Sequence, residues 1–387
     1  MTVGVVGAYG DRVVTVTAPQ PPATGTLSAS VWMDKTEGAP IATGALPLTF
    51  TLHDTGTGPG VHSLIAVSPD QDGPRYGIAF LNTELRLNQI QALGSHNSYH
   101  VATPDTPVEA WQYSHDPLDV QFQSEGVRQI ELDVWANPNG LAVFHIPSVD
   151  AGVTCSLLKT CLQTVKTWSD AHPKHLPIAI LIEIEDVPYT PDVKPFDAAA
   201  FDQLDNEIRS VFPPNRVLTP DDVRGSHATL AEAVTTDGWP TISSVRGQVL
   251  FLMDNADAHR DIYTAGHTSL QGRMLFTNAE AGRPDAAFVK LNDPIGDAQR
   301  IKDAVAAGYV VRTRADGDTI EARANNTVPR DTAIADGAQW VSTDYEVAGR
   351  AFGTPYFVQI PGGTPARCNP INAPAWCTSG QVESLTP

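Results

Sequence analysis

Three phrases of the sequence decide the fold and the site: GSHNSY at residues 94–99, ELDVW at 131–135 and VFH at 143–145. Each follows or completes a run typical of a β-strand, at 90–93, 127–130 and 141–144. Because side chains alternate along a strand, Glu131 and Asp133 share one face. Two carboxylates on one face repel each other and are costly to bury unless a cation lies between them.

A histidine precedes the acidic pair and another follows it. His96 ends the first strand and His145 ends the third, so both lead toward the same acidic residues. Two histidines beside an oxygen-rich site suit general acid–base chemistry next to a hard metal ion. Other histidines of the chain, such as His115, His172 and His259, are interpreted as structural.

Composition excludes several classes of protein. The chain of 387 residues has a net charge of −19 and 42% hydrophobic residues. It can therefore bury a sizeable core, but it lacks the basic clusters that bind nucleic acid or anionic membranes. No stretch is long and apolar enough to span a bilayer, and no signal peptide is visible at the N-terminus. The sequence does not define the oligomeric state, and we expect a monomer.

The four cysteines form two close pairs, Cys155 with Cys161 and Cys368 with Cys377. Four cysteines allow three connectivities, of which local pairing is the simplest. Neither spacing fits a Cys-x-x-Cys zinc knuckle. Two disulfides indicate an oxidising compartment, so we expect a secreted protein whose leader has been removed.

The chain changes character near residue 84. Residues 1–84 contain short alternating runs separated by Gly and Pro clusters, at 12–17, 27–32, 48–52 and 63–67. This pattern predicts a small N-terminal β-rich accessory module, followed by a catalytic domain over residues 85–387.

From residue 86 the pattern alternates strand, loop and helix. Later strands are predicted at 178–184, 249–253, 274–276, 287–291, 309–312 and 339–342, with helical apolar faces at 158–168 and 201–211. With the strands at 90–93 and 127–130 these make eight, which predicts an α/β fold, a (β/α)₈ TIM-type barrel, with allowance for distortion. The hairpin strand before His145 lies outside this count.

Taken together, the His-Asn phrase, the Glu-x-Asp strand and the later histidine resemble phosphatidylinositol-specific phospholipase C of the calcium-dependent, secreted bacterial type. The resemblance covers roughly residues 86–350. It implies Ca²⁺ as the cofactor, held by Asn97, Glu131, Asp133 and a glutamate on the strand after Pro177. Counting from that proline selects Glu183, with Glu185 as the alternative.

The resemblance also implies roles and a reaction. His96 would act as the general base on the inositol 2-hydroxyl, and His145 as the general acid on the departing diacylglycerol oxygen. The substrate would be an inositol phospholipid at a membrane or micelle surface. The products would be diacylglycerol and inositol 1,2-cyclic phosphate, which a second step opens to inositol 1-phosphate.

A further cation near the phosphate is expected from a count of charges. Lys290 and Arg312, at the ends of late strands, are the candidates, and Arg314 is a substitute on the same face as Arg312. Each is equally well interpreted as a structural ion-pair partner. Asp254 is a weaker candidate for binding inositol hydroxyls. Its strand carries no lysine, which favours unphosphorylated phosphatidylinositol or a glycosylated inositol lipid.

Two other functions compete with this prediction. Glycerophosphodiester phosphodiesterases also use a barrel, a metal and a Glu-x-Asp strand, but typically begin with His-Arg-Gly where this chain has His-Asn-Ser. The other competing hypothesis is a non-catalytic barrel that binds lipid or glycan. Retention of both histidines and of every expected ligand type argues against it.

Overall fold

The computed structural model describes residues 2–6, 12–18, 27–52, 60–69, 75–81, 85–103, 105–106, 108–138, 140–187, 192–374, 377, 379 and 382–383. The chain divides into two compact units, of which the first includes Met1–Glu84 and the second Leu85–Ala373.

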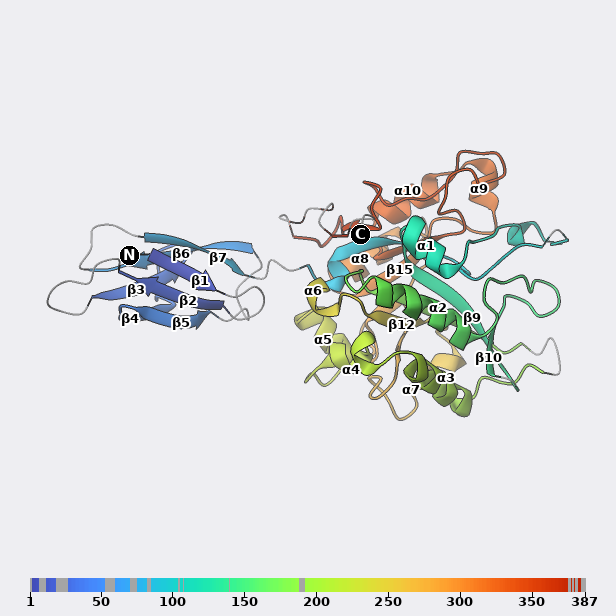
Figure 1. Ribbon diagram of the computed structural model, residues 1–387, viewed down its shortest axis with the longest axis horizontal. Coiled ribbons are helices and arrows are strands. Elements are labelled where there is room, and N and C mark those ends of the chain that lie inside the picture. Colours follow the sequence, from blue (N-terminus) through green and yellow to red (C-terminus); the bar gives the residue numbers. More distant parts are fainter. Residues whose placement is uncertain are drawn as a thin grey trace. The chain divides into compact units, whose positions relative to one another are not determined.

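The first unit consists of two antiparallel sheets (Figure 1). One sheet has the order β1 (Thr2–Val6), β2 (Arg12–Thr17) and β5 (Leu48–Leu52), and the other β4 (Ala42–Ala45), β3 (Ser28–Met33), β6 (Gly60–Val67) and β7 (Arg75–Leu81). Inward-facing residues of both sheets, such as Val14, Val31 and Leu64, form one small apolar core. The β-rich N-terminal module predicted from the alternating runs is confirmed.

The second unit is a nearly closed parallel barrel of eight strands surrounded by helices (Figure 1). The strands follow the order β13 (Leu275–Thr277), β12 (Val249–Met253), β11 (Ile178–Glu185), β9 (Val127–Asn137), β8 (Ile90–Ser95), β16 (Trp340–Thr343), β15 (Val310–Arg314) and β14 (Phe288–Lys290). Between β13 and β14, the described residues form only the isolated parallel bridge Asn278–Phe288. The predicted TIM-type barrel is confirmed, and this weak closure is its distortion.

The barrel strands form because their sequences can be buried on both faces. In β11, the run Ile178–Ile182 is buried at every position. A strand covered by neighbouring strands and by outer helices needs apolar side chains on both faces rather than strict alternation. The eight predicted strands all exist. The strand at 249–253 has the predicted bounds, and the others have ends that differ by one to several residues. β9 is the longest because it continues into a hairpin.

The helices bury the apolar faces predicted for them. In α2 (Leu158–Ala171), Leu158, Leu162, Val165 and Trp168 are buried. Helix α3 (Ala198–Val211) begins where the Asp197 side chain accepts bonds from two backbone amides. The remaining helices are α1 (Leu118–Ser124), α4 (Pro220–Arg224), α5 (Leu230–Thr236), α6 (Ile242–Val245), α7 (Ala258–Thr264), α8 (Ala298–Ala306), α9 (Ile320–Ala324) and α10 (Val328–Ala335). None of the described helices has the length and apolar run needed to cross a membrane.

Two short strands extend the barrel sheet. β10 (Gly140–Val143) pairs with β9 as an antiparallel hairpin, and β17 (Ala366–Cys368) pairs with β8. Both predicted disulfides are present, Cys155–Cys161 and Cys368–Cys377, and no cysteine is free. The second disulfide links the last residue of β17 to Cys377.

The end of the chain contributes a buried ion pair. Glu383 accepts three hydrogen bonds of 2.7–3.1 Å from Arg128, whose side chain is only 3% exposed. It also accepts one from the backbone amide of Leu176. The chain terminus is thereby joined to the first residues of β9 and to the turn before β11.

We predict that Glu383→Ala lowers the free energy of unfolding of the barrel by about 3 kcal/mol, because the substitution leaves the Arg128 guanidinium buried without its counter-charge. The matched control is Glu280→Ala, which removes an exposed pair with Arg300 and should change stability by less than about 1 kcal/mol. Urea unfolding measures both variants. Equal small losses would show that the terminal ion pair does not stabilise the fold.

Candidate active site

A cavity of about 260 Å³ lies at the carboxyl ends of the barrel strands. It is lined by His96, Asn97, Glu131, Asp133, His145, Glu183, Asp254 and Lys290, which are eight of the nine site residues predicted from the sequence. Arg312 is the ninth and does not line the cavity. The barrel thus brings together residues that lie up to 194 positions apart (from 96 to 290).

The loop after β8 is pinned to two neighbouring strands. The backbone amide of His96 bonds to the carbonyl of Thr343 at 3.0 Å, and the amide of Ser98 bonds to the carbonyl of Glu131 at 3.0 Å. Between them, Asn97 adopts a left-handed backbone conformation with φ 42°. Asparagine tolerates this region better than most residues, and the turn directs two polar side chains in succession to the cavity.

A carboxylate holds one ring nitrogen of His96. Its Nδ1 lies 2.8 Å from Oδ1 of Asp344, the residue that follows β16. Burial and the nearby Arg314 lower the pKa of His96 well below its ordinary value, so the ring is neutral at neutral pH. Because the Asp344 carboxylate accepts the Nδ1 proton, Nε2 carries the free lone pair. A neutral imidazole with one free nitrogen is the form required to remove a proton.

His145 has a carboxylate partner of its own. Its Nδ1 lies 2.7 Å from Oδ2 of Asp150, and its ring meets Trp111 edge-on with 5.3 Å between the ring centroids. Although burial by itself would raise it, hydrogen bonds from His100 and His145 lower the pKa of Asp150 to about 2. Asp150 is therefore ionised, and His145 turns its second nitrogen away from it.

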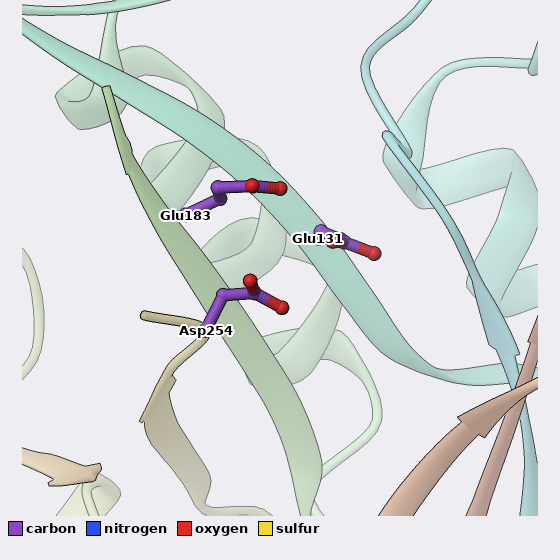
Figure 2. Close-up of side chains that lie close together, drawn as sticks. All are labelled: Glu131, Glu183 and Asp254. Carbon is purple, nitrogen blue, oxygen red and sulfur yellow. The ribbon is translucent and has the colours of Figure 1, made fainter. Parts of the chain in front are cut away.

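Carboxylates from three adjacent strands converge in this cavity. Oxygen atoms of Glu131, Glu183 and Asp254 all lie within 4.8 Å of one another. Figure 2 shows these three side chains close together. Asp133 stands opposite Glu183 in the ladder between β9 and β11 and lines the same cavity. The sequence predicted Asp254 as a sugar-binding residue, whereas the structure places it among the acids that could share an ion. Glu185 lines the cavity but is not part of this trio.

Some acids of the cavity have raised pKa values, and some of its buried oxygens lack hydrogen-bond partners among the described residues. Burial, followed by the charges of Glu183 and Glu131, raises the pKa of Asp133 well above its ordinary value. Burial and the neighbouring Asp254 raise the pKa of Glu183 to about 8. In addition, the Oδ1 atoms of Asn97, Asp133 and Asp254 are buried and have no hydrogen-bond partner among the residues that the structure describes. Orphaned oxygens and mutually repelling carboxylates fit a divalent cation that prefers oxygen ligands.

The basic residues divide between the cavity and its wall. Arg312 is fully buried, where it pairs with Glu131 and donates to Asn292 at 2.7 Å. It therefore has the role of an ion-pair partner, the alternative that the sequence left open. Arg314 lines the cavity and lies 3.4 Å from Asp344. Lys290 also lines it and pairs with Asp254.

Several residues of the site were not found from the sequence. Asp344 follows a strand end, the same signal that pointed to the other acids, and could have been recognised on that ground. His100 and Asp150 lie in loops and carry no such signal. His115 was expected to be structural; it is buried, contacts Glu346 at 3.0 Å and holds the carbonyl of His96 at 2.7 Å.

Comparisons with known proteins identify relatives of this barrel. The sequence matches the family described as phosphoinositide phospholipase C, Ca²⁺-dependent, over residues 85–141 and 137–370. A curated relative, PI-PLC X domain-containing protein 1 of the fungus Arthroderma benhamiae, is 25% identical over 214 residues, which are 54% of this chain and 60% of the relative.

Solved structures share the fold. A calcium-dependent phosphoinositol-specific phospholipase C from Pseudomonas sp. is 22% identical with a TM-score of 0.52, and the match covers 73% of this chain and 95% of that one. The myo-inositol complex of the Pseudomonas enzyme gives a TM-score of 0.53 at 21% identity, over 74% of this chain and 96% of the other. At this identity the likeness concerns the fold.

We predict that His115 stays protonated to about pH 9. Burial alone would lower its pKa, but the contact with Glu346 raises it to about 9. Because the unfolded value is near 6.5, this ion pair stabilises the protein fully below about pH 6.5 and less as the pH rises toward 9. Nitrogen-15 NMR of the imidazole should show both ring nitrogens protonated at pH 7.

The Glu346→Gln variant is the control for this titration. It removes the negative charge while it keeps an acceptor, so the midpoint of His115 should fall toward neutral pH. A wild-type ring that loses its proton near pH 6.5 would contradict the assignment of His115 as a buried cation.

Proposed function

Because this chain belongs to the calcium-dependent phosphoinositide phospholipase C family, we propose that it cleaves phosphatidylinositol, or a related inositol lipid, to diacylglycerol and an inositol phosphate. One observation supports this function above the others. Two histidines, each held at Nδ1 by its own carboxylate, line one cavity together with buried oxygens that lack partners.

In the proposed reaction, Nε2 of His96 accepts the proton of the inositol 2-hydroxyl as that oxygen attacks the adjacent phosphorus. The bond from phosphorus to the diacylglycerol oxygen breaks, and His145 delivers the proton that this leaving oxygen needs. The product is inositol 1,2-cyclic phosphate. In a second step the histidines exchange roles, and water opens the ring to inositol 1-phosphate.

The oxygens that fit a calcium ion belong to Asn97, Glu131, Asp133 and Glu183, with Asp254 close enough to join them. When bound, Ca²⁺ would acidify the attacking hydroxyl and neutralise charge on the phosphoryl oxygens. Arg312, which does not line the cavity, pairs with Glu131 and so keeps one of its carboxylate oxygens in position. Lys290 and Arg314 are the positive side chains of the cavity that can face the phosphate.

The charge of the cavity favours a head group without further phosphates. Seven carboxylates line it, against the two basic side chains of Lys290 and Arg314. With one divalent ion bound, the net charge of the groups that line the cavity would still be negative. Each additional phosphate on the inositol ring would therefore be repelled. We therefore infer that unphosphorylated phosphatidylinositol is preferred over its phosphorylated forms.

The surroundings of the cavity suit a lipid surface. Exposed apolar residues occur on the connections that follow five barrel strands, all at the end of the barrel that bears the cavity. They are Val108, Val187, Ile295, Ile320 and Phe352. Apolar side chains at the mouth can enter the interface while the acidic cavity receives the head group. The two disulfides favour an oxidising compartment, and we propose that the protein works outside the cell.

We predict that His96→Ala and His145→Ala each reduce turnover of phosphatidylinositol on the order of 10²-fold or more. An aryl leaving group, such as 4-nitrophenol, needs no acid. An inositol aryl phosphodiester should therefore partly restore the rate of His145→Ala but not of His96→Ala. Phosphorus-31 NMR follows the cyclic phosphate with both substrates.

The outcomes of this assay separate the competing functions. Equal rescue of the two variants would contradict the assigned roles. Turnover of glycerophosphodiesters in place of phosphatidylinositol would indicate the glycerophosphodiesterase. Inositol-lipid binding without any turnover would indicate a non-catalytic barrel.

We predict that activity requires Ca²⁺ and that Mg²⁺ substitutes poorly, because Mg²⁺ retains its waters and its octahedral geometry. Glu183→Gln should weaken calcium binding at least about tenfold and turnover with it, whereas Glu185→Gln, the matched control on the same strand face, should change binding little. Asp133→Asn should behave like Glu183→Gln. Isothermal titration calorimetry of the protein with Ca²⁺ measures the affinity.

The same titration has an expected pH dependence. Since the pKa of Glu183 without the ion is about 8, calcium must displace a proton below that pH, and its affinity should fall as the pH is lowered. Full activity after thorough chelation, or loss of binding in Glu185→Gln rather than Glu183→Gln, would overturn this assignment of the ligands.

A further inference from the structure

A second buried histidine shares the carboxylate that holds His145. Nε2 of His100 lies 3.0 Å from both Oδ1 and Oδ2 of Asp150, and its Nδ1 lies 3.0 Å from the carbonyl oxygen of Tyr113. The side chain of His100 is fully buried, and it does not line the cavity. His145, on the other side of Asp150, does line it. The three side chains thus form a line from the interior to the cavity.

Hydrogen-bond chemistry defines the direction of each contact. A backbone carbonyl and an ionised carboxylate can only accept, so both ring nitrogens of His100 donate. Oδ2 of Asp150 then accepts from His145 as well. A carboxylate that receives bonds at both oxygens cannot rotate without losing one of them, and charge-assisted bonds of this kind are among the stronger ones in proteins.

The backbone makes His100 the link between two loops. Asp150 and His145 lie on one tight turn, closed by bonds between the backbones of Ile146 and Asp150 at 3.0 and 3.2 Å. His100 belongs to the loop after β8 that carries His96, where its amide bonds to the carbonyl of Asn97 at 2.8 Å. The ring of Tyr113 packs on that of His100 with 4.5 Å between the centroids. His145 is therefore positioned relative to the loop of His96 through His100.

We propose that His100 is a positioning residue that acts through Asp150 on His145 and keeps Nε2 of His145 directed at the leaving-group oxygen. This inference rests on the proposed function for its catalytic consequence. The proton delivered to the leaving oxygen comes from Nε2 of His145, and His100 takes no part in that transfer. Loss of His100 frees Asp150 to turn, and His145 turns with it.

Kinetics on two leaving groups test the proposal. Asp150→Asn keeps the shape of the side chain, and His100→Leu removes both donors. Each should lower kcat on phosphatidylinositol by about tenfold or more, with KM changed by less than about threefold, because only transition-state proton delivery is impaired. On the inositol aryl phosphodiester, which needs no acid, each should retain kcat within about threefold of the wild type.

The control is His175→Leu, which removes another buried histidine. His175 contacts Ser169 and the carbonyl of Leu176 before β11, at the end of the barrel away from the cavity. A merely structural loss should affect both substrates equally, as expected for this control. Equal losses on both substrates in His100→Leu and Asp150→Asn would overturn the proposal. A further decrease in kcat when either substitution is added to His145→Ala would also overturn the proposal. If His100 and Asp150 act only through His145, they cannot affect kcat once His145 is removed.

A measurement without substrate separates this proposal from the proposed function. Nitrogen-15 NMR of the histidine rings, at a pH at which His145 is neutral, should place its proton on Nδ1 in the wild type. Asp150→Asn and His100→Leu should shift that proton toward Nε2. An unchanged Nδ1 signal in folded Asp150→Asn overturns the link even if the enzyme is active. The expected shift in a protein that cleaves neither substrate supports the link and rejects the function.

Discussion

The repulsion between carboxylates at the mouth of the barrel is the constraint on which the site depends. Glu131, Asp133, Glu183 and Asp254 are brought together by the parallel register of adjacent strands, so their separation cannot relax without breaking the sheet. Their negative charges are balanced only in part by Arg312 and Lys290. Burial, together with this imbalance, raises the pKa values of Asp133 and Glu183. A divalent cation bound among these oxygens would relieve it.

His96 and His145 are both held at Nδ1 by a carboxylate, but their surroundings differ. Each binds a carboxylate through Nδ1 and leaves Nε2 for chemistry, but Asp344 follows a barrel strand whereas Asp150 lies on the turn of its own histidine. Burial and Arg314 lower the pKa of His96, as a base requires. Asp150, by contrast, is held ionised by hydrogen bonds from His100 and His145, which lower its pKa to about 2 although burial would raise it. Similar contacts thus support the two different roles proposed for these histidines.

Stability and chemistry are placed at opposite ends of the barrel. At the amino ends of the strands, Glu383 neutralises the buried Arg128 and joins the chain terminus to β9. At the carboxyl ends, side chains are held close together with like charges, a left-handed Asn97 and unpartnered oxygens. Such a site costs folding free energy, which the large apolar core of the barrel offsets. The division is typical of this architecture, in which the connections after the strands carry the function.

Much of this protein could be predicted from the sequence because its signals are local. Apolar runs such as Ile178–Ile182 define buried strands, the spacing of Leu158, Leu162 and Val165 defines a helix face, and the close cysteine pairs define their partners. The Glu-x-Asp phrase placed two acids on one face, since alternation along a strand requires no tertiary information. His96 and His145 were singled out because each ends a predicted strand that leads toward these acids, which is also a local signal.

Tertiary structure alone decided which charged and polar side chains contact one another across the barrel. It separated Arg312, committed to Glu131, from Arg314, which lines the cavity, although the two lie on one strand face. It placed Asp254 beside Glu131 and Glu183, which come from other strands, and it set His100 and Asp150 behind His145. These contacts join residues 5 to 181 positions apart through strand register and loop conformation. Local periodicity does not encode such distances, because the closure of the barrel and the paths of its loops are set by the packing of the whole domain.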